Sequence, residues 1–192
     1  MKSKTFTAAV FSIALMAGTT SIFAQSKMTN EEKTVRVGGA AMYPSKNIVE
    51  NAVNSKDHTT LVAAVKAASL VETLQGEGPF TVFAPTNAAF NKLPEGTLET
   101  LVKPENKAKL QSILTYHVLA GNHSVAAIEK DINEGNGKAT YTTVNGGTLT
   151  AMMKAKKVVL MAENGGMATV TIADVNQSNG VIHVIDSIVL PK

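Results

Sequence analysis

The 192-residue sequence has no cysteine and no tryptophan, and aromatic residues make up only 5% of it. Without cysteine, the chain cannot form a disulfide scaffold, carry a cysteine nucleophile or bind zinc through thiolates. Its few aromatic side chains leave few surfaces on which nucleic acid bases could stack. Hydrophobic residues account for 44% of the sequence and charged residues for 17%. This composition is too apolar for a disordered chain, and the length predicts one domain.

The sequence has almost no net charge when the two lysines near its N-terminus are left out of the count. The formal net charge is +3, but Lys2 and Lys4 lie in a segment that we expect to be removed. Without these two lysines, the 18 basic residues fall to 16, against 15 acidic ones. A nearly neutral chain lacks the positive field that neutralises phosphate groups, so we expect no nucleic-acid partner.

Residues 1–24 have the features of a Sec-type signal peptide. Lys2 and Lys4 give a positive start, residues 8–17 form an apolar run, and small residues follow up to Ala24. A membrane-spanning helix needs about 20 apolar residues, so this run is too short to act as an anchor. The sequence therefore predicts cleavage after Ala24, a secreted or periplasmic protein, and no membrane span after signal removal.

The next segment, residues 25–45, is polar and contains Gly38, Gly39 and Pro44, which interrupt any regular pattern. We therefore expect a flexible N-terminal arm. The folded domain is expected to occupy residues 46–192.

Within this domain the pattern changes from helical to β near the middle of the sequence. Apolar spacing, capping residues and prolines predict helices near residues 48–53, 59–68, 70–74, 86–90, 94–101, 104–114 and 124–132. From residue 139 onward, β-favouring runs alternate with Asn-Gly turns. With two earlier runs, at residues 80–84 and 115–119, they give about seven strands. This order predicts an α+β fold, in which helices pack on one side of an antiparallel sheet system.

The sequence carries none of the common catalytic signatures. It lacks a G-x-S-x-G nucleophile elbow, an S-x-x-K motif, a phosphate-binding P-loop and an H-E-x-x-H zinc motif. The run from Asp174 to Ser178 starts like a calcium-binding loop. However, Asn179 occupies the position of the required glycine and Ile185 that of the bidentate glutamate. We therefore expect no enzymatic activity, no metal site and no cofactor.

The four histidines are the remaining candidates for metal ligands. His117 and His183 lie within apolar runs, which favours core or edge side chains hydrogen-bonded to the backbone over metal ligands. His58 and His123 are expected at the surface.

Four methionines lie close together in the β-rich half, at positions 152, 153, 161 and 167. The default expectation is that they fill gaps in the core. A soft-metal site and an adaptable surface for apolar ligands are the alternatives.

Three segments, in matching order and spacing, resemble the fasciclin (FAS1) family. Residues 81–90 (TVFAPTNAAF) resemble the first signature of that family, and residues 179–186 (NGVIHVID) resemble the second. Between them, Tyr116 and His117 resemble its Tyr-His motif. The resemblance covers about Ser45 to Leu190. The residues that carry the two signatures are Thr81, Phe83, Pro85, Thr86, Asn87, Phe90, Asn179, Gly180 and His183.

The resemblance implies a wedge-shaped β-sandwich of about seven strands with a helical layer packed on it. It also implies a non-catalytic adhesion or surface-interaction module, whose partner is a cell-surface or matrix protein or polysaccharide. In animal members, recognition is attributed to the Tyr-His region and to an Asp-Ile pair before the second signature. The matching positions here are Tyr116, His117, Asp174 and Val175. Some exported relatives bind carotenoids or other apolar molecules, so a carrier of a small apolar, carotenoid- or lipid-like ligand is the alternative function.

The Tyr-His motif also has a structural interpretation. If residues 115–119 form a strand, Tyr116 and His117 face opposite sides, and His117 shares its side with apolar Leu119. We therefore expect His117 to be a buried, neutral imidazole with hydrogen-bond partners and a pKa below its usual value.

Overall fold

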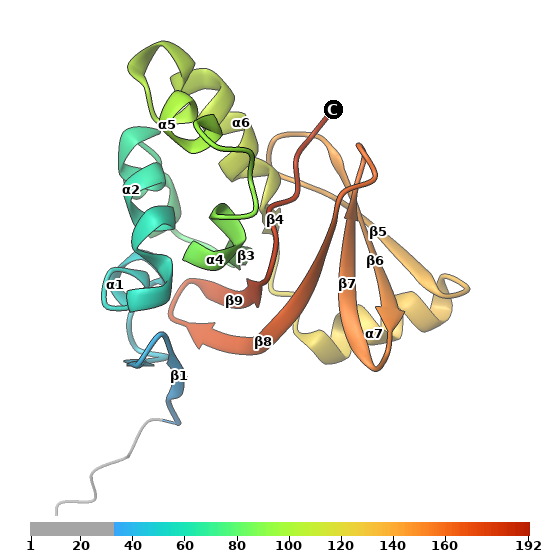
Figure 1. Cartoon of the computed structure of the whole chain (residues 1–192). Coiled ribbons are helices and arrows are strands. Elements are labelled where there is room, and N and C mark those ends of the chain that lie inside the picture. The colour runs from blue at the N-terminus through green and yellow to red at the C-terminus, as the bar shows by residue number, and fades with distance from the viewer. Residues whose placement is uncertain (1–32) are drawn as a thin grey trace, which may run out of the picture. The chain divides into compact units, whose positions relative to one another are not determined.

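The structure, a computed structural model, describes residues 33–192 (Figure 1). The predicted signal peptide, its cleavage after Ala24 and the first part of the predicted arm lie outside the described residues. No helix within residues 33–192 is long and apolar enough to cross a membrane.

Seven strands form one mixed sheet in the order β4-β3-β9-β8-β7-β6-β5. β3 and β9 pair in parallel, and the other neighbours pair antiparallel. The number of strands is therefore confirmed, whereas the purely antiparallel arrangement is wrong at the centre of the sheet. The strands are β3 (Phe80–Pro85), β4 (Val118–Ala120), β5 (Lys138–Thr142), β6 (Thr148–Lys154), β7 (Lys157–Ala162), β8 (Met167–Gln177) and β9 (Gly180–Ile185).

The central strands β3 and β9 are buried on both faces. Phe83 and Ile185 belong to a first core, which also contains Leu160 of β7. Val82 and Val184 belong to a second core on the opposite face. Strands covered on both sides need continuous apolar sequence, which explains the FTVFA and VIHVI runs.

Strand β8 joins the two halves of the sheet, which are β4, β3 and β9 on one side and β7, β6 and β5 on the other. Its register with β9 shifts twice between Val170 and Val175, and Asp174 has a positive φ of 54°. Such bulges bend a strand, and accordingly β8 pairs with β7 near its start and with β9 near its end. The two halves enclose the first core between them, as expected for the α+β sandwich.

The helices form two groups in Figure 1. Helices α1, α2, α5 and α6 lie away from β5–β7, whereas α7 packs on these three strands. The helices are α1 (Ile48–Ala52), α2 (Thr59–Ala67), α3 (Val71–Gln75), α4 (Asn87–Phe90), α5 (Thr97–Leu101), α6 (Lys107–Tyr116) and α7 (Val125–Glu134), with short 3-10 turns η1 (Lys56–His58) and η2 (Pro104–Asn106).

Three of these helices start at a side chain that accepts a hydrogen bond from the backbone. Asn47 Oδ1 accepts from the Glu50 N–H, and the Glu50 carboxylate accepts from the Asn47 N–H, which completes a capping box. Thr86 caps α4 and Ser124 caps α7, each at 3.2 Å. These oxygens satisfy N–H groups that have no partner inside the helix.

Residues 35–42 form a hairpin, which differs from the flexible arm expected up to Ser45. β1 (Val35–Val37) pairs antiparallel with β2 (Ala40–Met42), and Gly38 and Gly39 take positive φ values of 58° and 79° in the turn between them. Val37 and Met42 are each 3% exposed and belong to the second core. The two glycines therefore form a tight turn rather than interrupt the structure.

The predicted strand at residues 115–119 is wrong in its first half. Helix α6 continues through Tyr116, His117 is its C-terminal cap, and β4 starts at Val118. The apolar side chains of α6 keep their helical spacing up to Tyr116, which is buried with them. This packing overrides the β preference of the TYHVL run.

Candidate functional site

Tyr116 is fully buried at the end of α6. Its hydroxyl donates a hydrogen bond to the Thr148 carbonyl at 2.5 Å and accepts one from the Glu163 N–H at 3.1 Å. Burial raises the pKa of the phenol, which therefore stays neutral. The side chain joins α6 to the start of β6 and to the β7–β8 turn, and it has no surface with which to contact a partner.

His117 is 3% exposed and uses both ring nitrogens. Nδ1 lies 2.8 Å from the Ile113 carbonyl, and Nε2 accepts from the Val189 N–H at 3.2 Å. These partners assign the proton to Nδ1 of a neutral ring. Burial lowers the pKa of His117 to about 4, although the Ile113 carbonyl opposes the shift. The predicted buried, neutral imidazole is confirmed, on a helix cap instead of a strand.

Asp174 and Val175 both serve the fold. Asp174 Oδ1 accepts from the N–H of Val125, the first residue of α7, at 2.8 Å. A carboxylate is stabilising at a helix N-terminus. Val175 is 1% exposed in the second core. Of the four predicted recognition residues, only His117 and Val175 line a common feature, an apolar cavity.

His183 connects three segments from the centre of β9. Its Nε2 lies 2.8 Å from the His123 carbonyl, its Nδ1 accepts from the Asp174 N–H at 3.2 Å, and its ring stacks on Phe83. Burial lowers the pKa of His183, against the opposing effects of the His123 carbonyl and the Asp174 charge. His183 is therefore the core histidine that the sequence predicted.

The first signature fixes the start of two helices. Thr86 caps its own helix, α4, whereas Asn87 holds the start of α2. Asn87 Oδ1 accepts from the Thr60 N–H at 3.0 Å, and its Nδ2 donates to the Lys56 carbonyl at 2.9 Å. The remaining members of this signature are buried, namely Thr81, Phe83, Pro85 and Phe90.

The turn that opens the second signature fixes α1 and α3. Asn179 Oδ1 accepts from the Ile48 N–H at 3.0 Å, and Nδ2 donates to the Leu74 carbonyl at 2.9 Å. Gly180 lies so close to β3 that a Cβ would be 2.0 Å from the Phe80 carbonyl oxygen. Only glycine fits this position without moving the backbone.

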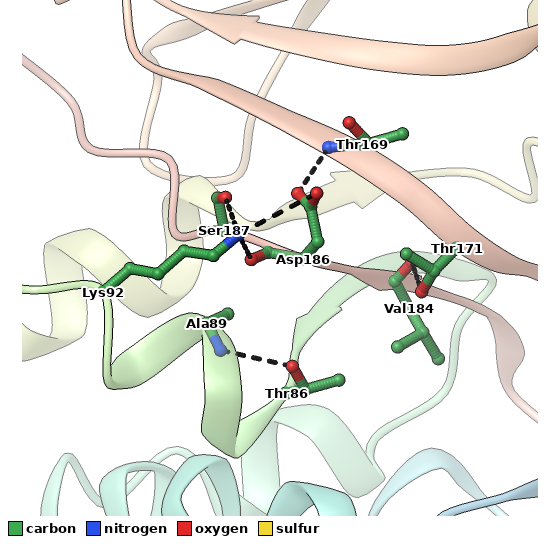
Figure 2. A network of polar contacts seen from close by, with 8 residues as sticks. All are labelled: Thr86, Ala89, Lys92, Thr169, Thr171, Val184, Asp186 and Ser187. Atoms are coloured by element: carbon green, nitrogen blue, oxygen red, sulfur yellow. Dashed lines mark hydrogen bonds and ion pairs between the residues drawn. The ribbon is translucent and has the colours of Figure 1, made fainter.

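Asp186, at the end of the second signature, is the centre of a polar network that the sequence analysis did not single out (Figure 2). Its Oδ1 accepts from the Thr169 N–H at 2.8 Å. Lys92 Nζ donates to the Asp186 carbonyl at 2.6 Å and to Ser187 Oγ at 3.0 Å. The network ties the end of β9 to β8 and to the segment after α4. In the sequence, the one feature that could have pointed to this network is that Asp186 directly follows the apolar run of β9.

An apolar cavity of about 80 Å³ lies between the hairpin, the first three helices and the central strands. A site for a drug-sized ligand typically encloses about 300–1,000 Å³. A carotenoid- or lipid-sized molecule would therefore require the helices and the hairpin to move apart. Side chains that line the cavity include Met42, Ile48, Leu61, Leu74, Val82 and Ile182.

His58 lines this cavity and is 3% exposed, so the expectation that it lies at the surface is wrong. Its Nδ1 lies 2.9 Å from Ser55 Oγ, whereas Nε2 has no hydrogen-bond partner among residues 33–192. Burial lowers the pKa of His58. The nearby Ala84 carbonyl opposes this shift but falls short of hydrogen-bond geometry. Nε2 is therefore an unused polar group in the cavity wall.

The methionines are not core side chains, so the default expectation for them is wrong. Met167 is 52% exposed and Met153 is 38% exposed, whereas Met152 and Met161 are half-buried. Strand alternation places Met152, Met161 and Met167 on the side opposite Leu149 and Leu160 of the first core, whereas Met153 is on the same side as Leu149 but near the end of β6.

We call the side of β5–β8 opposite the first core the outer face. One row of cross-strand neighbours on it consists of Thr140, Thr150, Met161 and Met167. The next row consists of Lys138, Met152, Val159 and Thr169. Solvent reaches both ends of the first row, since Thr140 and Met167 are exposed.

Within the part of the chain that the structure describes, no three His, Asp or Glu side chains are placed to hold a metal ion. The buried histidines instead bond to backbone groups or to Ser55. These hydrogen bonds link segments of the fold to one another.

Known proteins are similar in sequence to this chain over most of its length. The fasciclin domain family matches residues 56–191. Protein sll1483 of Synechocystis sp. is 48% identical over 168 residues, which cover 88% of this chain and 86% of the relative. Cell surface glycolipoprotein MPT83 of Mycobacterium tuberculosis is 36% identical over 160 residues, which cover 81% of this chain and 64% of the relative.

The fold is shared with a solved structure as well. A FAS1 domain pair from the insect cell adhesion molecule fasciclin I matches with a TM-score of 0.69 and 18% identity, over 83% of this chain and 58% of that chain. This likeness concerns the fold alone. The family match and the relatives above 30% identity together show that the chain belongs to the fasciclin family.

Proposed function

We propose that this protein is a non-catalytic, extracytoplasmic adhesion module that binds its partner through the outer face of β5–β8. The observation that carries the proposal is the burial of the motif residues Tyr116, His117 and Val175. A partner cannot reach these side chains in the folded protein. The outer face, in contrast, presents side chains such as Thr140 and Met167 to solvent.

The relatives support a role at the cell surface. One is named a cell surface glycolipoprotein, and the structural match is part of a cell adhesion molecule. The signal peptide predicted at residues 1–24 supports export, to the periplasm or out of the cell. The partner that fits these names is a surface or matrix protein or polysaccharide.

Two charges placed on the outer face test this proposal. Thr140→Glu with Met167→Glu changes opposite ends of one row, and Ala63→Glu with Ala67→Glu adds the same charge to the exposed side of α2. We expect the first pair to abolish binding to whole cells or isolated envelope, and the second pair to leave it intact. Unfolding by denaturant establishes that both variants fold. Equal binding by both would exclude the outer face, and no binding by the unmodified protein would exclude the function.

A carrier of a small apolar ligand is the second candidate, because the cavity has apolar walls and an unused nitrogen on His58. The protein, purified without denaturation, would then yield an apolar molecule on extraction, detected by mass and absorption spectrum. His58→Phe should lower the amount extracted, and His123→Phe, at a residue outside the cavity lining, should not. An extract without any such molecule would contradict the carrier function.

A further inference from the structure

We propose that four lysines at one end of the outer face bind an anionic polysaccharide that carries carboxylate groups. The four are Lys138, at the start of β5, and Lys154, Lys156 and Lys157, at the β6–β7 turn, and together we call them the lysine tip. The proposal rests on the proposed function, because it assigns a partner class to part of the outer face. Figure 1 shows this turn on the side of the molecule where α7 lies, away from α1, α2, α5 and α6.

The charge of the lysine tip is not compensated by the described part of the protein. All four lysines are exposed, residues 138–162 contain no acidic residue, and the ion pairs within residues 33–192 involve other lysines. The nearest acidic residues in sequence are Asp131 and Glu134 on α7 and Glu163 after β7, and all three already have partners. Glu163 accepts from the Thr148 N–H at 2.6 Å. Asp131 accepts from the Tyr141 hydroxyl at 2.8 Å, and Glu134 pairs with Lys130 at 3.6 Å.

Three of the four lysines lie close to one another on the same face of the sheet. Lys154 lies directly opposite Lys157 across the β6–β7 ladder, and Lys138 lies opposite Met152 on the neighbouring strand. Cross-strand partners share a face, and residues two apart on one strand share it as well. Three positive side chains therefore project from one face, although like charges directly opposite each other destabilise a sheet.

The turn itself is strained in a way that other turns of the same sheet avoid. Ala155 and Lys156 both have positive φ, of 50° and 63°. Two-residue turns of this shape favour Asn-Gly, because glycine adopts positive φ freely and asparagine tolerates it better than alanine or lysine does. The β7–β8 turn uses Asn164 and Gly165, and Gly165 has the positive φ there. Strained backbone is concentrated at functional sites, so the strain at the lysine tip, together with its uncompensated positive charge, supports a binding site there.

The surroundings favour a polysaccharide over a membrane or a nucleic acid. Next to the lysines, Thr140 lies opposite Thr150 and Thr142 opposite Thr148, so hydroxyl groups line the adjoining part of the face. Hydroxyls suit the hydroxyl and carboxylate groups of acidic sugars. Residues 152–158 contain no aromatic residue, whereas membrane-interface anchors use Trp and Tyr, and base recognition uses aromatic stacking.

The test compares two groups of three lysines. The tip variant is Lys154→Gln with Lys156→Gln and Lys157→Gln. The control variant is Lys103→Gln with Lys107→Gln and Lys109→Gln, which removes the same number of charges from three exposed lysines, of which Lys103 lies 4.0 Å from Glu105. Binding of the full chain to polygalacturonate is measured by titration at several salt concentrations, with dextran as the neutral polymer and phosphatidylglycerol vesicles as the anionic membrane.

We expect the unmodified protein and the control variant to bind polygalacturonate and not dextran. The tip variant should bind about tenfold more weakly or worse, with a shallower dependence on salt. It should remain at least as stable to denaturant, because the substitutions remove repulsion. Equal weakening in both variants, or binding to vesicles without binding to polygalacturonate, would overturn the proposal. If the unmodified protein adheres to cells and the tip variant adheres equally well, the lysine tip is excluded while the proposed function stands.

Discussion

His117 and His183 each connect segments that are far apart in the sequence. His117 joins α6 to the C-terminal segment at Val189, and His183 joins β9 to the His123 carbonyl and the Asp174 N–H. Because both nitrogens of each ring are used, removal of either side chain leaves buried backbone groups without partners. A role as acid, base or metal ligand is not needed to explain why either position is a histidine.

His117→Ala tests whether the Tyr-His motif acts through folding. The substitution leaves the Ile113 carbonyl and the Val189 N–H unpaired in the core, so it should lower the free energy of unfolding by about 1–3 kcal/mol. Denaturant unfolding and cell binding are measured on the same variant. If the variant kept normal stability and lost binding, His117 would belong to the interaction surface.

The lowered histidine pKa predicts that acid destabilises the protein. His117 has a pKa of about 4 in the folded state and about 6.5 when unfolded, so below pH 6.5 the unfolded chain binds a proton that the folded one excludes. The stability due to neutral His117 is therefore present above pH 6.5 and is lost as the pH falls towards 4. The expected loss is roughly 3 kcal/mol. His117→Gln should flatten the pH dependence of unfolding in this range, and an unchanged slope would contradict the assignment.

At the level of elements, signals carried by neighbouring residues were predictable. Thr86 starts α4 through a local capping hydrogen bond, and the apolar run of β9 indicates a strand that is buried on both faces. The end of α6 was not predictable, because Tyr116 has β preference and stays helical only through its contacts with β6 and the β7–β8 turn. The methionines show the same limit. Alternation indicates that strand residues face two sides, and only the tertiary structure shows which side is covered.

The same reasoning applies to the candidate site. Motif resemblance located Tyr116, His117, Asp174 and Val175, and the apolar run around His117 predicted its burial. The burial of Tyr116 and Val175 was not predictable, because it depends on contacts with distant parts of the chain. The lysine tip was visible as a Lys-Ala-Lys-Lys run. Its significance depends on the pairing of Lys154 with Lys157 and on the backbone of the turn, which only the structure provides.

Removal of the β1–β2 hairpin should destabilise the domain. A chain that begins at Tyr43 lacks Val37 and Met42, and full burial of such a side chain contributes about 1.5–3 kcal/mol, partly offset by the entropy of ordering the hairpin. We therefore expect a lower melting temperature than for a chain that begins at Lys33. Equal melting temperatures would show that residues 33–42 behave as the arm that the sequence predicted.

A turn of the favoured type should stabilise the β6–β7 hairpin. Ala155→Asn with Lys156→Gly places residues that tolerate positive φ at both strained positions and should raise the free energy of unfolding by about 1 kcal/mol. Gly39→Ala with Gly137→Ala places alanine at two positions with positive φ and should lower the free energy of unfolding, so it serves as the opposite control. A loss of stability from the first change would mean that the turn is not strained.

At the level of the whole molecule, β3 and β9 lie between the first and second cores and belong to both. Phe83 and Val82 are adjacent in β3 and face opposite cores, and Ile185 and Val184 do the same in β9. Neither core can lose its packing while these two strands keep theirs. The first core and the second core are therefore expected to unfold in one transition.

Truncation of one large side chain in each core tests this cooperativity. Leu160→Ala in the first core and Ile182→Ala in the second should each cost about 2–5 kcal/mol, because each leaves a cavity in a closely packed interior. Both should shift one and the same transition, seen equally by far-UV and near-UV circular dichroism and with equal calorimetric and van't Hoff enthalpies. Met167→Ala, at a side chain that is 52% exposed, should change the stability by no more than about 0.5 kcal/mol. Two separate transitions, with only one of them moved by Leu160→Ala, would mean that the cores fold independently and that β3 and β9 do not couple them.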